Sequence, residues 1–138
     1  MASIFTRIIQ GELPGRFVWR DERCVGFLSI APLRDGHTLV VPIAEVDHWL
    51  DVEPEVAAHL MTVAQTIGKA QMAAFAPARI GLIIAGLEVP HTHLHVLPID
   101  RESDLNFANA HPASGDELDG VARRLGEALT DLGHAPPA

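Results

Sequence analysis

The chain has 138 residues, 48% of them hydrophobic and 20% charged, with a net charge of −8 and a single cysteine. This length suits one domain that buries roughly two thirds of its unfolded surface; the composition argues against a disordered chain, and one cysteine excludes an intramolecular disulfide. The acidic balance disfavours non-specific nucleic-acid binding. Without a membrane span or a secretory signal segment, we expect a cytoplasmic protein that binds neither nucleic acid nor membrane.

The first part of the chain predicts a short helix and three strands. Gly11 and Pro14 end the helix, and a turn at 21–23 joins the first two strands. The run at 38–42 is short and β-branched, which favours a buried strand over a helix. The predicted elements are a helix at 3–10, strands at 17–20 and 24–30, a loop at 32–36 and a strand at 38–42.

The clearest predicted helix spans 54–75, where apolar residues recur at spacings of three and four. A second helix is expected at 115–132, because Ser114 and Glu117 form a capping box before it and Gly133 suits its C-terminal end. Strand pairs joined by tight turns, together with one long helix, predict an α+β domain with a mainly antiparallel sheet. Between the helices we expect a strand at 79–85, a turn at 86–90, a strand at 91–98 and an irregular segment at 101–113.

Histidines occupy the alternate positions 91, 93 and 95. Side chains alternate along a strand, so we expect His91, His93 and His95 on one face, about 6.6 Å apart. An imidazole can act as nucleophile, acid, base or metal ligand near neutral pH. The remaining histidines are expected at the surface, apart from His37, and Cys24 is expected to be a small buried residue.

Three interpretations of this pattern are open. The strand can simply present polar side chains to solvent, or it can serve phosphate chemistry. It can also hold a metal through a His-x-His chelate. A chelate needs further ligands, for which the candidates are His37, His48, Asp47 and Glu88.

Residues 91–97, His-Thr-His-Leu-His-Val-Leu, resemble the signature of the histidine-triad (HIT) superfamily, in which histidines alternate with apolar residues. Thr92 is a mild departure from that signature. The resemblance covers most of the chain and is specific, because further segments are similar to the family at 4–14, 36–42, 88–90 and 105–110.

The resemblance implies a HIT-like fold, an antiparallel sheet with one long helix packed on it and a C-terminal helix. The HIT domain is then expected at 1–112, with the C-terminal helix and tail of the same domain at 113–138. It also implies a homodimer, in which two subunits join their sheets into one.

The chemistry that the resemblance implies is hydrolysis or transfer at the α-phosphate of a purine nucleotide or nucleotide conjugate, with no cofactor or metal. His93 matches the nucleophile, which forms a nucleotidyl-histidine intermediate, and His91 helps to position it. His95 and the upstream His37 match residues that contact phosphate oxygens. Covalent catalysis divides one difficult displacement into two easier ones, and flanking imidazoles can stabilise charge on the phosphoryl oxygens.

The nucleoside needs an apolar slot, which the family builds from the N-terminal helix and the strand before the first long loop. The apolar candidates can equally be core residues. The candidate nucleotide-binding residues are Ile4, Phe5, Ile8, Phe27, Ser29, Ile30, Leu87 and Val89.

Some positions depart from the family pattern. Ser29 replaces an Asp that grips the ribose, which removes charge-assisted hydrogen bonds. Leu87 stands where a Gln helps to bind phosphate. Zinc prefers thiolate and imidazole ligands, so we expect no structural zinc at the positions taken by Ser3, Thr6 and Glu45.

These departures leave the nucleophile but reduce the contacts that position the ligand. The leading hypothesis is therefore an enzyme, a nucleotidyl hydrolase or transferase of the phosphoramidase or dinucleoside polyphosphate hydrolase type. The alternatives are a binding module without catalysis and a metal-dependent His-x-His enzyme. An acidic residue, Asp100, follows the triad and suits a phosphate site only if it turns away.

Overall fold

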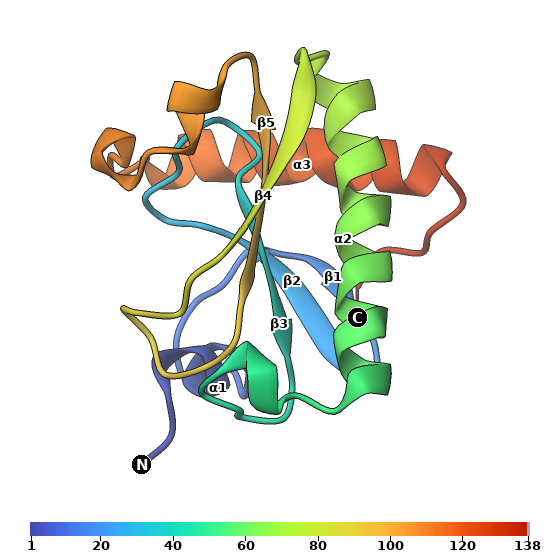
Figure 1. The fold of residues 1–138 in the computed structure, drawn as a ribbon. Helices are drawn as coiled ribbons and strands as arrows, with labels where there is room; N and C mark the ends of the chain where they lie inside the picture. Colours follow the sequence, from blue (N-terminus) through green and yellow to red (C-terminus); the bar gives the residue numbers. More distant parts are fainter. Residues whose placement is uncertain (138) are drawn as a thin grey trace.

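The strands pair into one five-stranded sheet in the order β1-β2-β3-β5-β4, and each neighbouring pair is antiparallel (Figure 1). The structure is a computed structural model that describes residues 1–137. The predicted α+β class is confirmed. The elements are α1 (Ile4–Ile9), β1 (Phe17–Arg20), β2 (Cys24–Leu28), β3 (Thr38–Pro42), η1 (Trp49–Asp51), α2 (Pro54–Phe75), β4 (Arg79–Ile84), β5 (Leu94–Ile99), η2 (Glu102–Leu105), η3 (Phe107–Asn109) and α3 (Gly115–Asp131).

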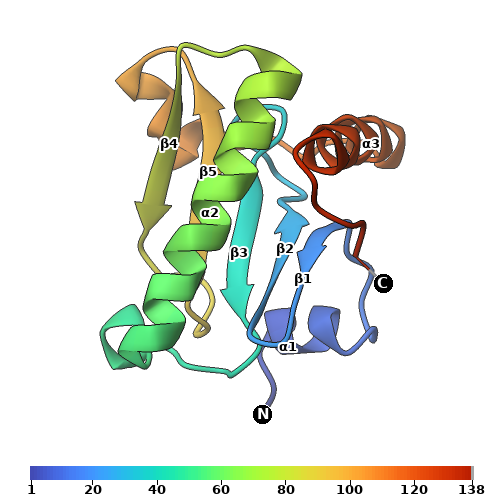
Figure 2. The same ribbon diagram turned by 90° about the vertical axis from the view of Figure 1, so that its right-hand side faces the viewer.

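Helices cover both faces of the sheet. Figure 2 shows α2 lying along one face of the sheet, α3 beside β1, and α1 near the N-terminus of the chain. Because strand side chains alternate, Cys24 and Leu28 of β2 join a core cluster with α2 and α3. Val25 and Phe27 of the same strand join a second cluster with Phe5 of α1. The sheet therefore separates an α2 side from an α1 side.

A buried glutamine connects α2 to the chain segments that carry His37 and His95. Gln71 is fully buried, and its Nε2 donates to the carbonyls of Gly36 and Val96 at 2.8 and 2.9 Å. Gly36 precedes His37, and Val96 follows His95 in β5. A buried N–H without a partner is costly, so these bonds constrain the position of α2 on the sheet. These two hydrogen bonds hold the backbone next to His37 and His95, which are predicted site residues.

Several predicted boundaries are confirmed. The helix at 54–75 has the expected bounds, the Ser114–Glu117 capping box is present, and Gly133 has φ +96°. No helix within residues 1–137 is long and apolar enough to cross a membrane.

The predicted strand at 91–98 begins late. β5 starts at Leu94, because the His91 N–H donates to the carbonyl of Val89 at 2.8 Å and the Thr92 N–H donates to that of Val46 at 2.7 Å. These bonds replace pairing with a neighbouring strand. The expectation that His91 and His93 lie on a regular strand face was therefore wrong. The strands predicted to end at 30 and 85 stop at Leu28 and Ile84.

Candidate functional site

His93 is held in a single tautomer by the chain beside it. Its Nδ1 lies 2.7 Å from the backbone carbonyl of His91. A carbonyl only accepts, so Nδ1 carries the hydrogen and Nε2 keeps its lone pair. The residue is 5% exposed, and its ring meets that of Phe5 edge-on at 4.9 Å. The arrangement presents one fixed, neutral nitrogen nucleophile.

His91 has no nitrogen left for chemistry. Its Nε2 donates to the carbonyl of Pro42 at 2.7 Å, so its Nδ1 accepts a hydrogen bond from Ser3 Oγ at 2.7 Å. The residue is fully buried. His91 therefore links the end of β3 to the start of α1, and its own carbonyl orients His93.

His37 and His95 form a relay with a defined direction. The Leu33 N–H donates to His37 Nδ1 at 3.1 Å, so His37 donates from Nε2 to His95 Nδ1 at 2.9 Å. His95 is left with an Nε2–H to offer to a ligand. The ring centroids of His93 and His95 lie 4.8 Å apart, so this donor belongs to an imidazole that packs against His93.

Burial keeps these imidazoles neutral. It lowers the pKa of His37 to about 4, with a further contribution from His93. Burial, followed by the neighbouring His37 and His93, lowers the pKa of His95 to about 3. Burial also lowers the pKa of His93, although its bond to the His91 carbonyl acts in the opposite direction. At neutral pH His93 therefore has its Nε2 lone pair available, and the Nε2–H of His95 can donate from a neutral ring.

Four side chains meet around the N-terminus of α1. The Ser3 hydroxyl caps the helix by accepting from the Thr6 N–H, and Glu45 accepts from the Ser3 N–H and from the Thr6 hydroxyl, at 2.6 and 2.7 Å. Together with His91, these are the positions at which the sequence resemblance implies a structural zinc site in relatives. Here the donors are two hydroxyls, a carboxylate and an imidazole nitrogen that already accepts a hydrogen bond, which is a poor zinc set. The residues present do not fit the metal.

A hollow of about 190 Å³ opens beside His93, between the loop after β3 and the loop after β4. Leu87 lines it and is 94% exposed. The other described residues that line it are Asp47, His48, Trp49, Ile84, Ala85, Gly86, Thr92 and His93, so no lining residue is Lys or Arg.

The predicted nucleoside-binding residues divide into two groups. Phe5, Phe27, Ile8 and Val89 pack together in the α1-side cluster next to His93. In contrast, Ile4, Ile30 and Leu87 are 49%, 72% and 94% exposed and do not join that cluster. The hydroxyl of Ser29 accepts from the Ala31 N–H at 3.3 Å, and the Ser29 N–H donates to the carbonyl of His37. Ser29 therefore lies next to the relay.

One contact of the site was not predicted from sequence. Phe107 of η3 meets the ring of His95 edge-on at 5.0 Å, although the segment around it was expected only to be irregular. Asn106 caps that short helix, which is the local signal that was available. Asp100 turns away from the histidines, as a phosphate site requires, and pairs with Arg34 at 2.9 Å.

Comparison with known proteins identifies the family. Residues 10–102 match the HIT domain. The chain is 34% identical to an uncharacterized HIT-like protein of Methanocaldococcus jannaschii over 126 residues, which cover 88% of this chain and 97% of the relative. It is 29% identical to the adenylylsulfatase HINT3 of Arabidopsis thaliana over 111 residues, which cover 77% of this chain and 56% of the plant protein.

Comparison with solved structures gives the same family. The crystal structure of a zinc-bound histidine triad family protein from Mycobacterium smegmatis superposes with a TM-score of 0.82 at 30% identity, covering 96% of both chains. The match to the family covers the sheet, the long helix and all of the histidines described above. The chain belongs to the HIT domain family.

Proposed function

We propose that this protein binds a purine nucleotide or nucleotide conjugate and hydrolyses or transfers it at the α-phosphate through a covalent intermediate on His93. The observation that carries the proposal is the fixed tautomer of His93, which keeps a free Nε2 and packs against the ring of His95, where His37 fixes an Nε2–H. A nucleophile and an adjacent donor are what displacement at phosphorus needs.

The reaction proceeds in two displacements. His93 Nε2 forms a bond to the α-phosphorus as the bond to the leaving group breaks, and the leaving group takes that electron pair and a proton from solvent. A water oxygen then bonds to phosphorus and gives up a proton, and the phosphorus–nitrogen bond breaks to free the imidazole. His95 donates to a phosphoryl oxygen in both steps, where charge develops.

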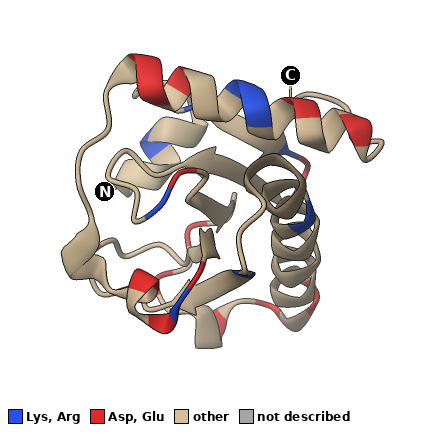
Figure 3. Cartoon of the chain, turned by 90° about the horizontal axis from the view of Figure 1, so that it is seen from above, with Lys and Arg blue, Asp and Glu red and all other residues tan. Residues whose placement is uncertain are grey.

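The charges around the hollow favour an amine over a polyphosphate as the leaving group. No lining residue is Lys or Arg, and Asp47 lines the hollow. The net charge of −8 gives no general attraction for anions, and Figure 3 shows acidic segments on α3 and on several loops, with few basic ones between them. A polyphosphate would add charge that nothing there neutralises, so we assign a nucleoside phosphoramidate as the preferred substrate.

We assign the nucleoside to the apolar side of His93, where Phe5, Ile8, Phe27 and Val89 pack together. Ser29 lies beside the relay and is our candidate for a ribose contact. A serine supplies a neutral hydroxyl, so we expect the protein to discriminate weakly between ribose and deoxyribose conjugates.

We further propose a homodimer formed through the free edge of β4. This strand is the last in the sheet order and exposes Leu82 and Ile84, while α2 exposes Met61 and Met72 beside it. Exposed apolar surface next to an unpaired strand edge is typical of an interface. Light scattering at micromolar concentration is expected to give twice the chain mass, and a monomer would contradict this assignment.

A binding module without turnover is the second candidate, and Leu87 favours it. Its side chain cannot donate to phosphate and is 94% exposed, so the ligand would be held by fewer contacts. A His-x-His metal enzyme is less well supported, because both nitrogens of His91 are already engaged at 2.7 Å.

The test is a turnover panel of adenosine and guanosine phosphoramidates, dinucleoside polyphosphates and adenylyl sulfate, with calorimetry on product mononucleotides. We expect the phosphoramidates to turn over fastest. Micromolar nucleotide binding without product at long times would favour the binding module instead. Equal inertness of the wild type and His93→Ala, with no binding, would remove both.

A further inference from the structure

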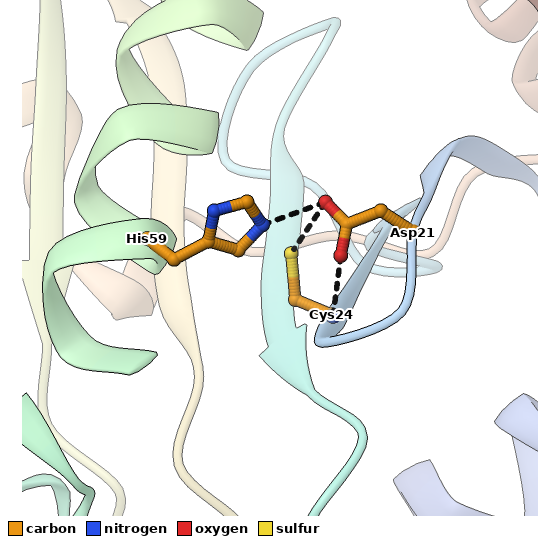
Figure 4. Close-up of side chains that lie close together, drawn as sticks. All are labelled: Asp21, Cys24 and His59. Atoms are coloured by element: carbon orange, nitrogen blue, oxygen red, sulfur yellow. Dashed lines mark hydrogen bonds and ion pairs between the residues drawn. The ribbon is translucent and has the colours of Figure 1, made fainter. Parts of the chain in front are cut away.

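A second polar cluster lies on the α2 side of the sheet, away from the triad. Asp21 in the β1–β2 turn, Cys24 at the start of β2 and His59 of α2 bring one ligand atom each within 4.8 Å of one another (Figure 4). Cys24 belongs to the core cluster of α2 and α3, whereas the triad packs against α1. This cluster and the triad therefore occupy opposite faces of the sheet.

The two oxygens of Asp21 have different partners. Oδ1 accepts from the backbone N–H groups of Arg23 and Cys24 at 2.8 and 2.9 Å, which fixes the carboxylate in the turn. Oδ2 faces the His59 Nε2 at 2.7 Å and the Cys24 Sγ at 3.7 Å, and accepts from Trp19 Nε1 at 2.7 Å. One oxygen therefore positions the group, and the other lies between an imidazole and a thiol.

We propose that Asp21, Cys24 and His59 form a binding site for Zn²⁺ or a similar transition-metal ion. Thiolate, imidazole and carboxylate together are typical ligands of such ions rather than of Mg²⁺ or Ca²⁺. Tetrahedral coordination at ordinary bond lengths needs about 3.6 Å between sulfur and oxygen and about 3.3 Å between nitrogen and oxygen.

The sulfur–oxygen distance of 3.7 Å already meets this requirement. The imidazole must withdraw from 2.7 Å by about 0.6 Å to meet the tetrahedral value.

The cluster is partly open to solvent. The side chains of His59 and Asp21 are 26% and 25% exposed, while Cys24 is fully buried beneath them. An ion arriving from solvent meets the imidazole and carboxylate first, and water completes its coordination.

Binding has a defined proton balance. The His59 Nε2 presents its lone pair to the metal, so its hydrogen moves to Nδ1 with no net release. The Cys24 thiol gives up its proton as the metal–sulfur bond forms. One proton is therefore released for each ion bound to neutral imidazole. Burial and the neighbouring Asp21 raise the pKa of the Cys24 thiol to about 12, so the thiol is protonated until the metal displaces that proton.

The test is a titration of the full chain, without an affinity tag, with Co²⁺ and then Zn²⁺. Cys24 is the only cysteine, so a thiolate-to-cobalt charge-transfer band reports this site alone. We expect one equivalent of Co²⁺ to give that band together with the visible spectrum of tetrahedral cobalt, and Zn²⁺ to abolish both. No band at saturating Co²⁺ would overturn the proposal.

Variants separate this site from the triad. Cys24→Ser should abolish the band, and His59→Gln and Asp21→Asn should each weaken Co²⁺ binding at least tenfold. The matched control His134→Ala should keep the charge-transfer band, because that ring lies 5.2 Å from Trp19 but outside the cluster. The His93→Ala/His95→Ala variant should also keep the band. A band that survives both His59→Gln and Asp21→Asn would contradict the assignment, and thermal melts without metal show whether each variant folds.

Discussion

The two faces of the sheet use histidine in opposite ways. On the α1 side, the imidazoles bond to neutral partners, which are carbonyls, a hydroxyl and one another. On the α2 side, His59 bonds to the carboxylate of Asp21 at 2.7 Å. Neutral partners in a buried site favour uncharged rings that keep one lone pair and one N–H, whereas a carboxylate partner favours an anchor or a metal ligand. The partner, more than the histidine itself, determines the role.

The largest expected effect is on the proposed nucleophile, His93. His93→Ala should lower kcat/KM for a nucleoside phosphoramidate by about 10³-fold or more, because no other group supplies the same fixed lone pair. The matched control is His111→Ala on the exposed segment after η3, which should keep wild-type activity. Steady-state kinetics on both variants checks this prediction. Equal losses of kcat/KM in the two variants would mean that His93 is not the nucleophile.

The relay gives the next effect. His95→Ala should cost about 10²-fold in kcat, the usual loss for one donor to a phosphoryl or oxyanion oxygen. His37 acts through His95, so adding His37→Ala to His95→Ala should cause little further loss of kcat. A double-mutant cycle measures this coupling, and strictly additive losses would show that the two residues act separately.

The faces should also differ in how stability depends on pH. The folded pKa values of His37 and His95, about 4 and about 3, lie below the ordinary value of 6.5. The unfolded chain therefore binds protons first, and stability that is complete above pH 6.5 is lost as the pH falls towards those values. Denaturation at pH 7 and pH 4.5 should show a smaller loss for His37→Gln/His95→Gln than for the wild type.

Asp21 should act in a more acidic range, with the smallest effect. Burial raises its pKa, but hydrogen bonds from Trp19, the backbone of Arg23 and Cys24, and His59 outweigh this and hold the pKa well below the ordinary value of 3.8. Its contribution is present above that value and lost only below it. Asp21→Asn should cost about 1–2 kcal/mol at pH 7 and flatten the stability curve below pH 4. If Asp21→Asn instead flattened the stability curve between pH 6.5 and 4.5, the two faces would depend on pH in the same range. That result would contradict the comparison.

Local patterns predicted much of the fold. Periodicity and Pro54 predict α2 with its observed bounds, and the Ser114–Glu117 pair predicts the start of α3, because both signals lie within the element itself. The start of β5 could not be predicted, since it depends on a bond from Thr92 to Val46, far away in sequence.

The site shows the same limit. The alternate histidines are visible in sequence, but their tautomers depend on Pro42, Ser3 and Leu33. Exposure separates Phe5 and Phe27 from Ile30 and Leu87, which composition alone treats alike. The bond between His59 and Asp21 joins positions 38 apart, and so the second cluster is visible only in the fold.

The most direct test of the central claim is to trap the intermediate. Acid-free quenching within one turnover of a nucleoside phosphoramidate, followed by proteolysis and mass spectrometry, should find one nucleotidyl group on His93 of the wild type and none in His93→Ala. Turnover without any adduct, or an adduct on His95 or His37 instead, would contradict the account.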